Sequence, residues 1–523
     1  MMEFFSNIEF EDLDINMEEI SLEEIRRAID KLKSGKSPGV DGITAEMLKC
    51  DKETSCKILQ DIINKVWNAE KIPNEWKKGV IVKLPKKGDL SCCGNWRGIT
   101  LLSIPGKVLS RILLERMKDT LDAKLREEQA GFRAKRSCTD HIFTIRTIIE
   151  QSLEWQSTAY LNFIDFEKAF DSIHRETLWQ ILRSYGIPVK YVNIIKDMYE
   201  GYSCTVRHDG KHSEWFNITS GVRQGCILSP FLFLTTIDWV MRRSTRNNAG
   251  IQWTLITFLE DLDFADDICL TSHTRNQMQD KTHKVAFEAS QIGLKINEKK
   301  TKLMVINGKS QQTVKLNERN IDQVDDFCYL GSTLSSDGDI MTEIKIRIGK
   351  AASAFNNLNN IWKSRKISRT TKMKLYRSNV RTVLLYGAET WRTNKTIESK
   401  LRGFEGRCLR RILNIRWPQT ISNKDVQEKT GINDINLEIT KRRWRWLGHV
   451  LRMDSTRHTK TALYWTPQGQ RKRGRPKGTW RRTIEEEMKP SNQTWNGLGI
   501  LARNRGNWRT AVDALCTDKC EED

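Results

Sequence analysis

Short apolar runs alternate with amphipathic stretches along the chain, which predicts a mixed α and β fold. The runs Ala159–Ile164, Leu255–Leu259 and Ile268–Leu270 have the length of buried strands. The last two flank Phe264-Ala265-Asp266-Asp267, so we predict a strand, turn and strand that present two adjacent carboxylates. Asp165 follows the first run and predicts a third carboxylate at the end of a neighbouring strand.

Helical periodicity is clear on both sides of this strand region. Ser21-Leu22-Glu23-Glu24 is a capping box that opens an amphipathic pattern, and Gly35 ends the pattern. The apolar segment Phe231–Val240 predicts a buried helix. Beyond residue 336 the chain is mostly helical in pattern, with one face formed by Ile344, Ile348, Ala351, Ala352, Phe355 and Leu358.

Three carboxylates at one end of a sheet are typical of two-metal phosphoryl transfer. Two divalent cations about 3.5 to 4 Å apart repel each other, so their site needs several anionic oxygens, and Mg²⁺ prefers carboxylate oxygen. We predict that Asp165, Asp266 and Asp267 are catalytic residues that bind two Mg²⁺ ions, with Mn²⁺ as an alternative. An Asp pair by itself is also common at strand ends, where Asp favours turns, so the neighbouring motifs decide between the two interpretations.

Five segments, in this order, resemble the motifs of reverse transcriptases from non-LTR (LINE-type) retrotransposons. They are Phe163–Ile173, Gly221–Pro230, Phe264–Asp267, Gly293–Lys302 and Phe327–Ser332. The resemblance implies an α+β right-hand polymerase with fingers, a palm that contains an antiparallel sheet, and a helical thumb. The chain departs from the usual Tyr-Ala-Asp-Asp of the family, because Phe replaces Tyr; we expect changed fidelity before lost activity.

The resemblance also implies which residues bind the incoming nucleotide. Gln224 and Gly225 belong to the second palm motif, and Lys302 is implied to protonate pyrophosphate. Lys83 and Arg97, in two predicted finger strands, are implied to bind the triphosphate, since ammonium and guanidinium groups suit phosphate oxygens. For Lys83 a solvated surface charge is the alternative.

Phe170 lies five residues after Asp165, where the family places an aromatic ring under the sugar of the nucleotide. Such a ring would clash with a ribose 2′ hydroxyl and would favour deoxynucleotides by sterics. The alternative is a core Phe on a helix face. The steric interpretation disfavours an RNA-directed RNA polymerase, which would share the three acids.

Two further segments are implied to contact the nucleic acid. Gln129–Arg133, followed by Ser137–His141, matches a family segment on the template strand, and Arg133 is its candidate contact. His141 is more typical of a satisfied helix histidine than of a ligand. The last palm segment resembles the primer grip, a short hairpin whose candidate residues are Phe327, Tyr329, Leu330 and Gly331.

The charge of the chain predicts a polyanionic partner. The net charge is +21 and the isoelectric point is near 9.4. Basic residues with interleaved Trp concentrate beyond Lys363, and the candidates for nucleic-acid contact are Arg443, Arg445, Arg473 and Arg475. Trp444 also has helical spacing with Leu447 and Val450, so a core position is an equal alternative.

Arg471–Lys477 is the most basic run, and its Gly and Pro predict an extended arm. Such an arm suits an A·T minor groove, a nuclear localisation signal or a solvated linker. Gly448–Met453 and Gly474–Pro476 resemble the C-terminal region of RTE-like elements. The predicted organisation is an acidic N-terminal segment (1–20), fingers (21–155), palm with primer grip (156–335), thumb (336–455) and a basic, mostly helical nucleic-acid-binding extension (456–523).

Several functions are disfavoured by what the sequence lacks. The glycine-rich loop Lys33–Ile43 does not have the spacing of an ATPase phosphate loop. The twelve cysteines are scattered, their spacing predicts no zinc site, and no apolar stretch approaches membrane-spanning length. With no secretion signal, we expect a reducing intracellular compartment and no membrane partner.

The resemblance to this family implies an RNA-directed DNA polymerase that uses deoxynucleoside triphosphates, and the RNA template rests on that resemblance alone. It would extend a DNA primer or nicked target DNA on an RNA template in the nucleus, after assembling with RNA in the cytoplasm. Full elements of this kind carry an N-terminal endonuclease, whereas this chain begins almost directly with the fingers, so we expect a separate endonuclease to be needed. The alternative is a noncatalytic nucleic-acid-binding protein derived from a decayed or domesticated element.

Overall fold

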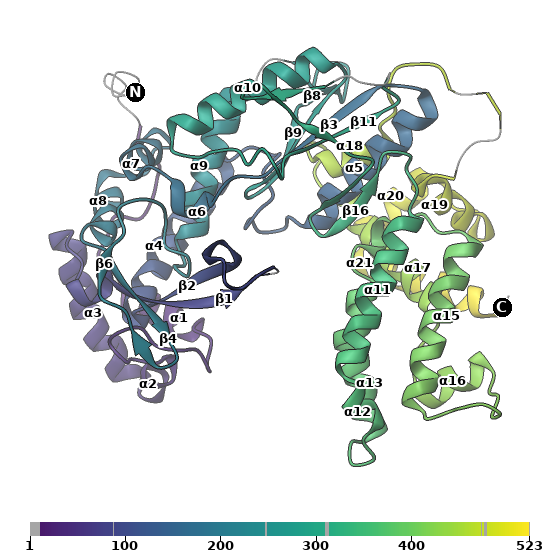
Figure 1. Cartoon of the computed structure of the whole chain (residues 1–523), viewed down its shortest axis with the longest axis horizontal. Helices are drawn as coiled ribbons and strands as arrows, with labels where there is room; N and C mark the ends of the chain where they lie inside the picture. The colour runs from purple at the N-terminus through teal and green to yellow at the C-terminus, as the bar shows by residue number, and fades with distance from the viewer. Residues whose placement is uncertain are drawn as a thin grey trace.

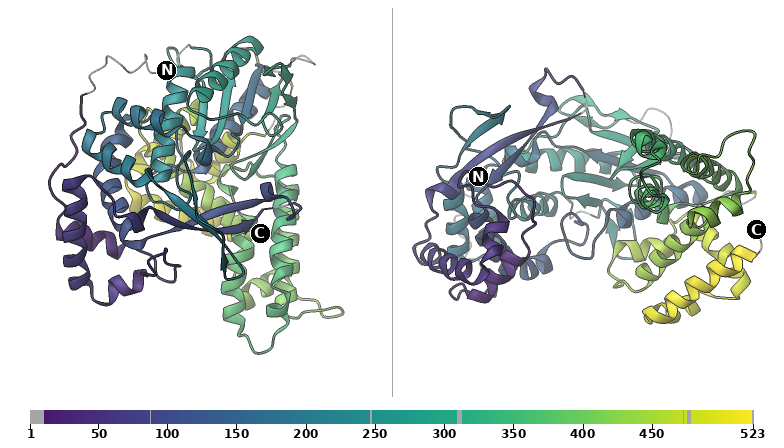
Figure 2. Two further views of the ribbon diagram at one scale, coloured as in Figure 1. Left: turned by 60° about the vertical axis from the view of Figure 1, so that its left-hand side comes forward. Right: turned by 90° about the horizontal axis from the view of Figure 1, so that it is seen from below.

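The computed structural model describes residues 11–86, 88–245, 248–308, 313–471, 473–474 and 478–521. These residues form an arch (Figure 1): N-terminal helices lie on the left, a central sheet lies at the top, and C-terminal helices descend on the right. Figure 2 shows the same structure from two other sides. The class is α+β, as predicted, with most strands in the first two thirds of the chain.

The fingers begin with helices that follow their sequence signals. Ser21 caps the first helix through the predicted capping box with Glu24, and the helix ends at Asp30, before Gly35, with Lys31 as its C-cap. Its buried residues pack on the neighbouring helices in one core. The helices are α1 (Leu22–Asp30), α2 (Ala45–Cys50), α3 (Lys52–Ala69) and α4 (Ile104–Lys124).

The fingers sheet combines two separate parts of the chain. The predicted finger strands form an antiparallel hairpin of β1 (Lys78–Pro85) and β2 (Trp96–Leu102), and β1 also pairs in parallel with β4 (Ser203–His208). The short strands β5 (Lys211–His212) and β6 (Phe216–Asn217) pair with β4. The chain therefore returns to the fingers after it has built the first palm strand.

The palm sheet has the strand order β14-β11-β3-β10-β9 and is antiparallel except for its edge strand β14. Its strands are β3 (Ala159–Ile164), β9 (Asp261–Phe264), β10 (Asp267–Ser272), β11 (Lys302–Ile306) and β14 (Asp322–Gln323). Around it lie α5 (Cys138–Trp155), α6 (Ala169–Ser172), α7 (Arg175–Ser184), α8 (Val189–Tyr199), α9 (Ser229–Ser244) and α10 (Arg275–Gln291). Two hairpins complete the palm, β7 (Ile251–Gln252) with β8 (Phe258–Leu259) and β12 (Lys315–Leu316) with β13 (Arg319–Asn320).

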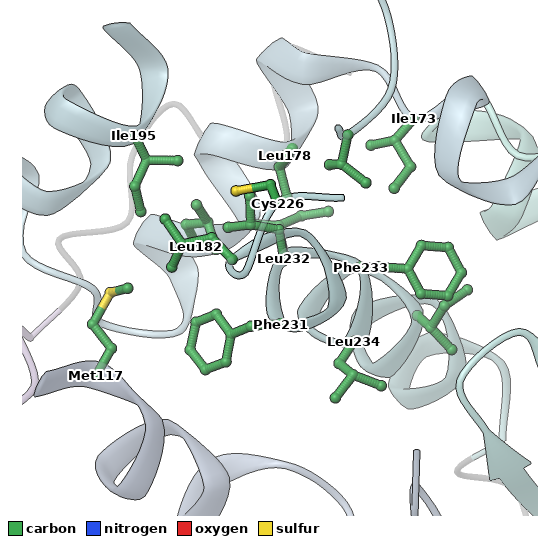
Figure 3. Close-up of a cluster of buried hydrophobic side chains, with 14 of the residues drawn as sticks. Met117, Ile173, Leu178, Leu182, Ile195, Cys226, Phe231, Leu232, Phe233 and Leu234 are labelled. Carbon is green, nitrogen blue, oxygen red and sulfur yellow. The ribbon is translucent and has the colours of Figure 1, made fainter. Parts of the chain in front are cut away.

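Both faces of the palm sheet are covered, which explains why β3 is an uninterrupted buried run. Tyr160 and Ile164 face the core that contains α9, whereas Leu161 and Phe163 face a second core with α5 and the C-terminal helices. Figure 3 shows part of the first core, in which Phe231 to Leu234 of α9 lie among side chains from α4, α7 and α8. β3, which leads to Asp165, is thus held by apolar packing on each side.

The prediction of a strand at Leu255–Leu259 is wrong for the first residues of that range, because β8 begins only at Phe258. Leu255 and Ile256 are 89% and 86% exposed in the loop between β7 and β8. The strand that leads to the Asp pair is β9, whose buried side chains include the carboxylates of Asp261 and Asp263. A search for apolar runs misses such a strand because ion pairs, and not apolar packing, satisfy its buried side chains.

The thumb is helical, as predicted, and has its own core. Ile344, Ala351 and Phe355 are buried on the predicted face of α11, and Ile348, Ala352 and Leu358 pack beside them. The helices are α11 (Met341–Asn357), α12 (Asn359–Lys363), α13 (Arg369–Leu375), a π-helical turn (Tyr376–Arg381), α14 (Thr382–Leu384), α15 (Lys395–Ile412) and α16 (Asn423–Thr430).

The C-terminal helices pack against the palm. They are α17 (Ile435–Leu451), α18 (His458–Tyr464), α19 (Trp480–Met488), α20 (Trp495–Arg503) and α21 (Arg505–Glu521). Trp446 and Trp480 form edge-on contacts with Phe143 of α5, with ring centroids 4.5 and 4.8 Å away. This core joins segments that the predicted domain boundaries separate. In the described part of the chain, no helix is long and apolar enough to span a membrane.

Candidate active site

Two segments, the end of β3 and the β9–β10 hairpin, bring the predicted acids to one end of the palm sheet. β3 and β10 are antiparallel, with Ile164 opposite Ile268. Continuing this register by one residue places Asp165 opposite Asp267, the first residue of β10. Asp266 precedes Asp267 in the turn after β9. The charge of Asp165 contributes to the raised pKa of the Asp266 carboxyl group. The structure therefore brings Asp165, Asp266 and Asp267 together.

The turn that carries the Asp pair is held by a buried glutamine. Ala265 has a φ of 58°, a left-handed conformation that costs energy for a residue with a Cβ atom. The side-chain Oε1 of Gln129 accepts hydrogen bonds from the backbone N–H of Ala265 and of Gly131, both at 2.8 Å. A Cβ on Gly131 would lie 2.3 Å from the backbone nitrogen of Ala265, so only glycine permits this close approach.

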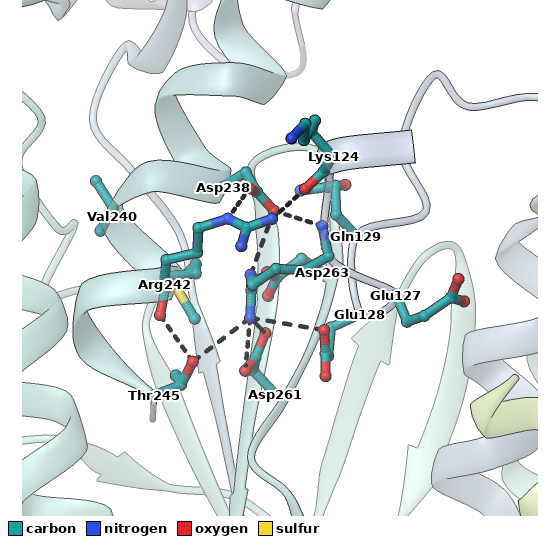
Figure 4. A network of polar contacts seen from close by, with 12 residues as sticks. Lys124, Glu127, Glu128, Gln129, Asp238, Val240, Arg242, Thr245, Asp261 and Asp263 are labelled. Carbon is teal, nitrogen blue, oxygen red and sulfur yellow. Dashed lines mark hydrogen bonds and ion pairs between the residues drawn. The ribbon is translucent and has the colours of Figure 1, made fainter. Parts of the chain in front are cut away.

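A buried ion network fixes the strand before the turn. Arg126 lies between acids of β9, with Nη1 2.8 Å from Asp261 and Nη2 2.5 Å from Asp263. Asp238 of α9 accepts from the backbone N–H of Arg126 at 3.0 Å. Figure 4 shows these carboxylates converging from different elements. Burial opposes the charge of Arg126, but the acids raise the pKa of its guanidinium well above the ordinary value. The network ties β9 to the loop after α4 and to α9.

The site concentrates negative charge. Burial, and then the charges of Asp266 and Asp165, raise the pKa of Asp267 to about 6. Burial and Asp165 also raise the pKa of Asp266, although the positive charges of Arg97 and Lys300 oppose this shift. Carboxylates that repel one another in this way gain from a bound cation.

The donor set suits a hard cation, since all three groups offer carboxylate oxygen. In the described residues, however, no three His, Cys, Asp or Glu side chains already have the arrangement of a metal site. The ammonium of Lys300 instead lies 3.0 Å from Oδ2 of Asp165. The side chains at this sheet end therefore fit a divalent ion chemically.

A cavity of about 500 Å³ lies beside Asp165 and Asp267 and reaches the predicted primer-grip hairpin. Its lining includes Asp165, Asp267 and Lys300 together with Phe327 and Tyr329. The hairpin consists of β15 (Asp326–Tyr329) and β16 (Ser332–Ser335), as the sequence predicted. Leu330 and Gly331 form its turn with φ of 47° and 79°.

The hairpin is anchored on the palm sheet. The Phe327 ring stacks on Phe163 of β3 with centroids 4.2 Å apart, and the Tyr329 hydroxyl donates to the carbonyl of Leu262 at 3.0 Å. The exposed Cys328 lies between these two anchors. The hairpin is thus a fixed wall of the cavity.

The fingers meet the palm at the second motif. The backbone N–H of Thr100 in β2 donates to the carbonyl of Gln224 at 2.7 Å. Gly225 has a φ of 119°, and a Cβ there would lie 2.4 Å from the carbonyl oxygen of Thr100. The Gln224 side chain donates to Asp171 at 3.1 Å. These contacts set the position of β2 and hence of the exposed Arg97. The positive charge of Arg97 opposes the rise in the pKa of Asp266.

Lys83 and Arg97 lie on opposite faces of the finger hairpin, so the structure does not bring the predicted pair together. Lys83 pairs with Gly98 and Arg97 pairs with Leu84, and side chains alternate along each strand. The Lys83 ammonium lies 4.3 Å from the ring centroid of Trp96 and 3.3 Å from Nε2 of His208. Lys86 continues the strand on the face of Arg97. Burial raises the pKa of Asp171, and the charge of Lys86 opposes part of this rise.

Phe170 links the first two motifs, Phe163–Ile173 and Gly221–Pro230. Its ring stacks on Phe233 of α9, with centroids 4.5 Å apart and planes at 11°. Its carbonyl accepts from the backbone N–H of Val222 at 2.7 Å. The ring is only partly buried. Phe170 is therefore a rigidly held ring at the junction of the two motifs, and its contact with a sugar stays a prediction.

Lys302 is less suited than Lys300 to the role that the sequence gave it. Its ammonium pairs with Asp322 of the edge strand at 2.6 Å, although its side chain lines the cavity. Lys300 is two residues earlier in the same motif and contacts the triad directly. The strand register decides the difference, because β11 begins at Lys302 and Lys300 belongs to the preceding turn.

Two predicted nucleic-acid contacts are structural. The guanidinium of Arg443 is fully buried and donates to Glu487 at 2.7 Å and to Thr393 at 3.0 Å. The Arg133 side chain is 4% exposed and binds Asp122 at 2.6 Å. Both predictions are wrong, because a buried, paired guanidinium cannot contact phosphate without breaking these bonds. Arg445 and Arg473 are exposed, and Arg475 lies outside the described residues.

For Trp444 and His141, the structure favours the alternative interpretation as core residues. Trp444 is buried, donates to Glu487 at 2.7 Å and stacks on Trp508. His141 is buried in α5 and meets the Phe264 ring edge-on, with centroids 6.4 Å apart. Neither residue is free to contact a ligand.

Comparison with known proteins agrees with this geometry. Residues 84–334 match the reverse transcriptase (RNA-dependent DNA polymerase) family, so they form a reverse transcriptase domain. Residues 354–386, in the thumb, match a domain family of unknown function. The described palm sheet, primer-grip hairpin and finger hairpin all lie within or at the edges of the first match.

The similar proteins come from retrotransposons. The chain is 28% identical over 315 residues to the Pol polyprotein of the type-2 retrotransposable element R2DM of Drosophila melanogaster, covering 58% of this chain and 29% of that protein. It is 30% identical to a 149 kDa protein of transposon TX1 of Xenopus laevis, covering 42% and 17%. It is 25% identical to the probable RNA-directed DNA polymerase from transposon X-element of Drosophila melanogaster, covering 79% and 46%. The chain thus spans less than half of each of these relatives.

Among solved structures, one of telomerase from Candida tropicalis in complex with a fragment of telomeric RNA matches 77% of this chain and 67% of that chain. Its TM-score is 0.39 and the sequence identity is 13%.

Proposed function

We propose that this chain, whose residues 84–334 form a reverse transcriptase domain related to the polymerases of non-LTR retrotransposons, extends a DNA primer on an RNA template. One observation carries the proposal. Asp165 and the adjacent pair Asp266-Asp267 come from two segments to one end of the palm sheet, between the finger hairpin and the predicted primer-grip hairpin.

Finger cations support binding of a nucleoside triphosphate at this place. Arg97 and Lys86 share one face of the finger hairpin. The charge of Arg97 favours the ionised form of Asp266 in the palm, and the charge of Lys86 favours that of Asp171. A guanidinium and an ammonium on one face can hold phosphate oxygens above the acids. We therefore propose that Arg97 and Lys86 bind the triphosphate, and that Lys83, on the opposite face, does not.

The stacked pair Phe170 and Phe233 supports selection of deoxynucleotides. A ring held by stacking cannot turn aside easily when a ribose 2′ hydroxyl approaches, so a clash costs binding energy. Gln224 lies next to this pair through its bond to Asp171 and would contact the same nucleotide. Their proximity favours a single nucleotide pocket between the fingers and the palm.

Reverse transcriptases generally use divalent metal ions, and here the triad would hold two, Mg²⁺ or Mn²⁺. Such ions would neutralise phosphate charge and lower the pKa of the primer 3′ hydroxyl. The chain itself contributes Lys300, whose ammonium lies beside Asp165 and can give a proton to the leaving pyrophosphate. The primer-grip hairpin would hold the primer end against the triad through the cavity that they share.

One observation favours a second candidate, a nucleic-acid-binding protein without catalysis. In the described residues, no three His, Cys, Asp or Glu side chains are already arranged for a metal ion. A decayed element that kept its fold and its charge of +21 would still bind RNA or DNA.

A primer-extension assay tests the proposal. The purified chain receives a primed RNA template, Mg²⁺ and either deoxy- or ribonucleotides, and the Asp266→Asn, Asp267→Asn double variant is the matched control. Extension with deoxynucleotides only, abolished in the control, supports the polymerase. Salt-sensitive binding of the template without extension in either protein supports the noncatalytic candidate.

We also propose that the reaction takes place in the nucleus at nicked target DNA. The basis is the kinship with retrotransposon polymerases and the basic composition, which suits polyanionic partners.

A further inference from the structure

A basic groove lies beside α12 and α13, which Figure 1 shows at the end of the thumb farthest from the palm sheet. It has a volume of about 1030 Å³ and runs between the α12–α13 turn and the C-terminal end of α15. Eight of its fifteen lining residues are Lys or Arg, and none is Asp or Glu. Its α12–α13 side falls within the match to the domain family of unknown function.

Three of these cations build the walls of the groove. The Lys372 ammonium donates to the carbonyl of Trp362 at 2.8 Å, so it fastens α13 to α12. Arg411 donates to Asn359 at 2.9 Å and joins α15 to α12. Arg410 donates to Asn423 at 2.8 Å and joins α15 to α16. The groove is therefore a fixed feature of the thumb.

The other five cations face solvent. Lys363, Arg365, Arg369, Arg407 and Arg416 are all exposed. None of them forms an ion pair with a carboxylate in the described part of the chain, in contrast to Arg381 nearby, which pairs with Glu405 at 3.0 Å. Like charges this close repel one another, so folding alone does not favour the cluster, whereas a polyanion would.

An exposed tryptophan stands next to the groove. Trp417 is 88% exposed, follows Arg416 directly and belongs to the loop between α15 and α16. A large aromatic side chain gains nothing from folding when it is left in water, since its apolar area stays hydrated. Next to unpaired guanidinium groups, such a ring is typical of proteins that stack an unpaired base while basic side chains follow the backbone.

We propose that this thumb-tip groove binds an unpaired nucleic-acid strand. The exposed cations, Arg365, Arg407 and Arg416 among them, contact successive phosphates, and the Trp417 ring stacks on a base. The occupant is single-stranded, because paired bases do not expose a face for stacking. This site is separate from the polymerase site and does not depend on its turnover.

Binding of a fluorescently labelled 12-nucleotide strand to the full chain tests the groove. The measurement uses anisotropy without nucleotides, after the palm has been saturated with an unlabelled primer–template duplex. Trp417→Ala is expected to weaken binding about tenfold, and Trp417→Phe to restore most of it. The triple variant Arg365→Ala, Arg407→Ala, Arg416→Ala is expected to lower the slope of log K against log salt by about 2.

Matched controls separate the groove from general charge. Lys395→Ala with Lys400→Ala removes exposed charges from the other end of α15 and should leave affinity within twofold. A strand containing 4-thiouridine should crosslink to the peptide that contains Trp417. Equal affinity of Trp417→Ala and the parent chain, or crosslinks only outside 363–417, would overturn the proposal.

Three ligands distinguish the source of the strand. Single-stranded RNA, single-stranded DNA and a blunt duplex are compared; preference for either single strand supports the proposal, and preference for the duplex contradicts it. Primer extension on a short homopolymer template should be unchanged in Trp417→Ala. A defect in extension with normal strand binding would count against this site while leaving the polymerase proposal intact.

Discussion

The Oε1 atom of Gln129 accepts a hydrogen bond from the backbone N–H of Ala265, 2.8 Å away, in the turn that presents the Asp pair. Because Gln129 is fully buried and also accepts from Gly131, one side chain from the loop after α4 sets the conformation of a turn 136 residues away. The turn could not be expected to hold Ala265 at positive φ without this bond.

Gln129→Ala should weaken both folding and catalysis. Two buried N–H groups lose their acceptor, at about 1–3 kcal/mol each, so we expect the free energy of unfolding to fall by about 2–4 kcal/mol. Among folded molecules kcat should fall at least tenfold, because the Asp pair loses its position. Chemical denaturation and steady-state extension measure the two effects. Gln323→Ala, at an exposed position on β14, is the control; equal kcat in both variants would show that the bond does not position the turn.

Lys300→Ala should lower kcat about 100-fold, whereas Lys302→Ala should lower it less than threefold. The reason is that the Lys300 ammonium lies 3.0 Å from Asp165, while that of Lys302 is paired with Asp322. Single-turnover extension measures both. A larger loss in Lys302→Ala would reverse the assignment.

Phe170→Ala should relax sugar selection. Without the ring, we expect the ratio of kcat/KM for deoxy- over ribonucleotides to fall at least tenfold, since the steric clash with the 2′ hydroxyl disappears. Competition between the two nucleotides at one template position measures the ratio. Phe233→Leu, which removes the stacking partner but keeps Phe170, should give a smaller change. An unaltered ratio in Phe170→Ala would leave the residue as a core side chain only.

The buried His141 should make the fold sensitive to acid. Burial lowers the pKa of His141 from 6.5 to about 3. Below pH 6.5 the imidazole therefore binds a proton in the unfolded chain but stays neutral in the folded chain. The stability contributed by the neutral ring is present above pH 6.5 and is lost as the pH falls toward 3; between pH 7 and pH 5 the loss is about 2 kcal/mol. His141→Leu should therefore show a shallower decline of unfolding free energy over this range. Denaturation of the variant, beside an exposed-site control His212→Leu, tests this; parallel declines would contradict it.

The local elements were largely accessible from the sequence, because their signals are local. The capping box at Ser21, the apolar face of α11 and the hairpin at Leu330-Gly331 each depend on residues a few positions apart. The order of the five motifs also sufficed to place the three acids at one sheet end.

Side chains that act through long-range partners were missed. Arg126, Gln129 and Lys300 look like ordinary surface residues until Asp263, Ala265 and Asp165 are brought to them. Arg443 was misread for the converse reason, because its partner Glu487 lies 44 positions away. One signal could have separated Lys83 from Arg97: strand alternation across the finger hairpin assigns them to opposite faces.

The central claim is that Asp165, Asp266 and Asp267 bind divalent cations together, and counting bound Mn²⁺ by electron paramagnetic resonance tests it most directly. The full chain carries a primer–template duplex whose primer ends without a 3′ hydroxyl, with the next deoxynucleotide present. We predict two bound ions per chain, and at least tenfold weaker binding in both Asp165→Asn and Asp267→Asn. Equal Mn²⁺ binding by the parent chain and the two variants would contradict the account.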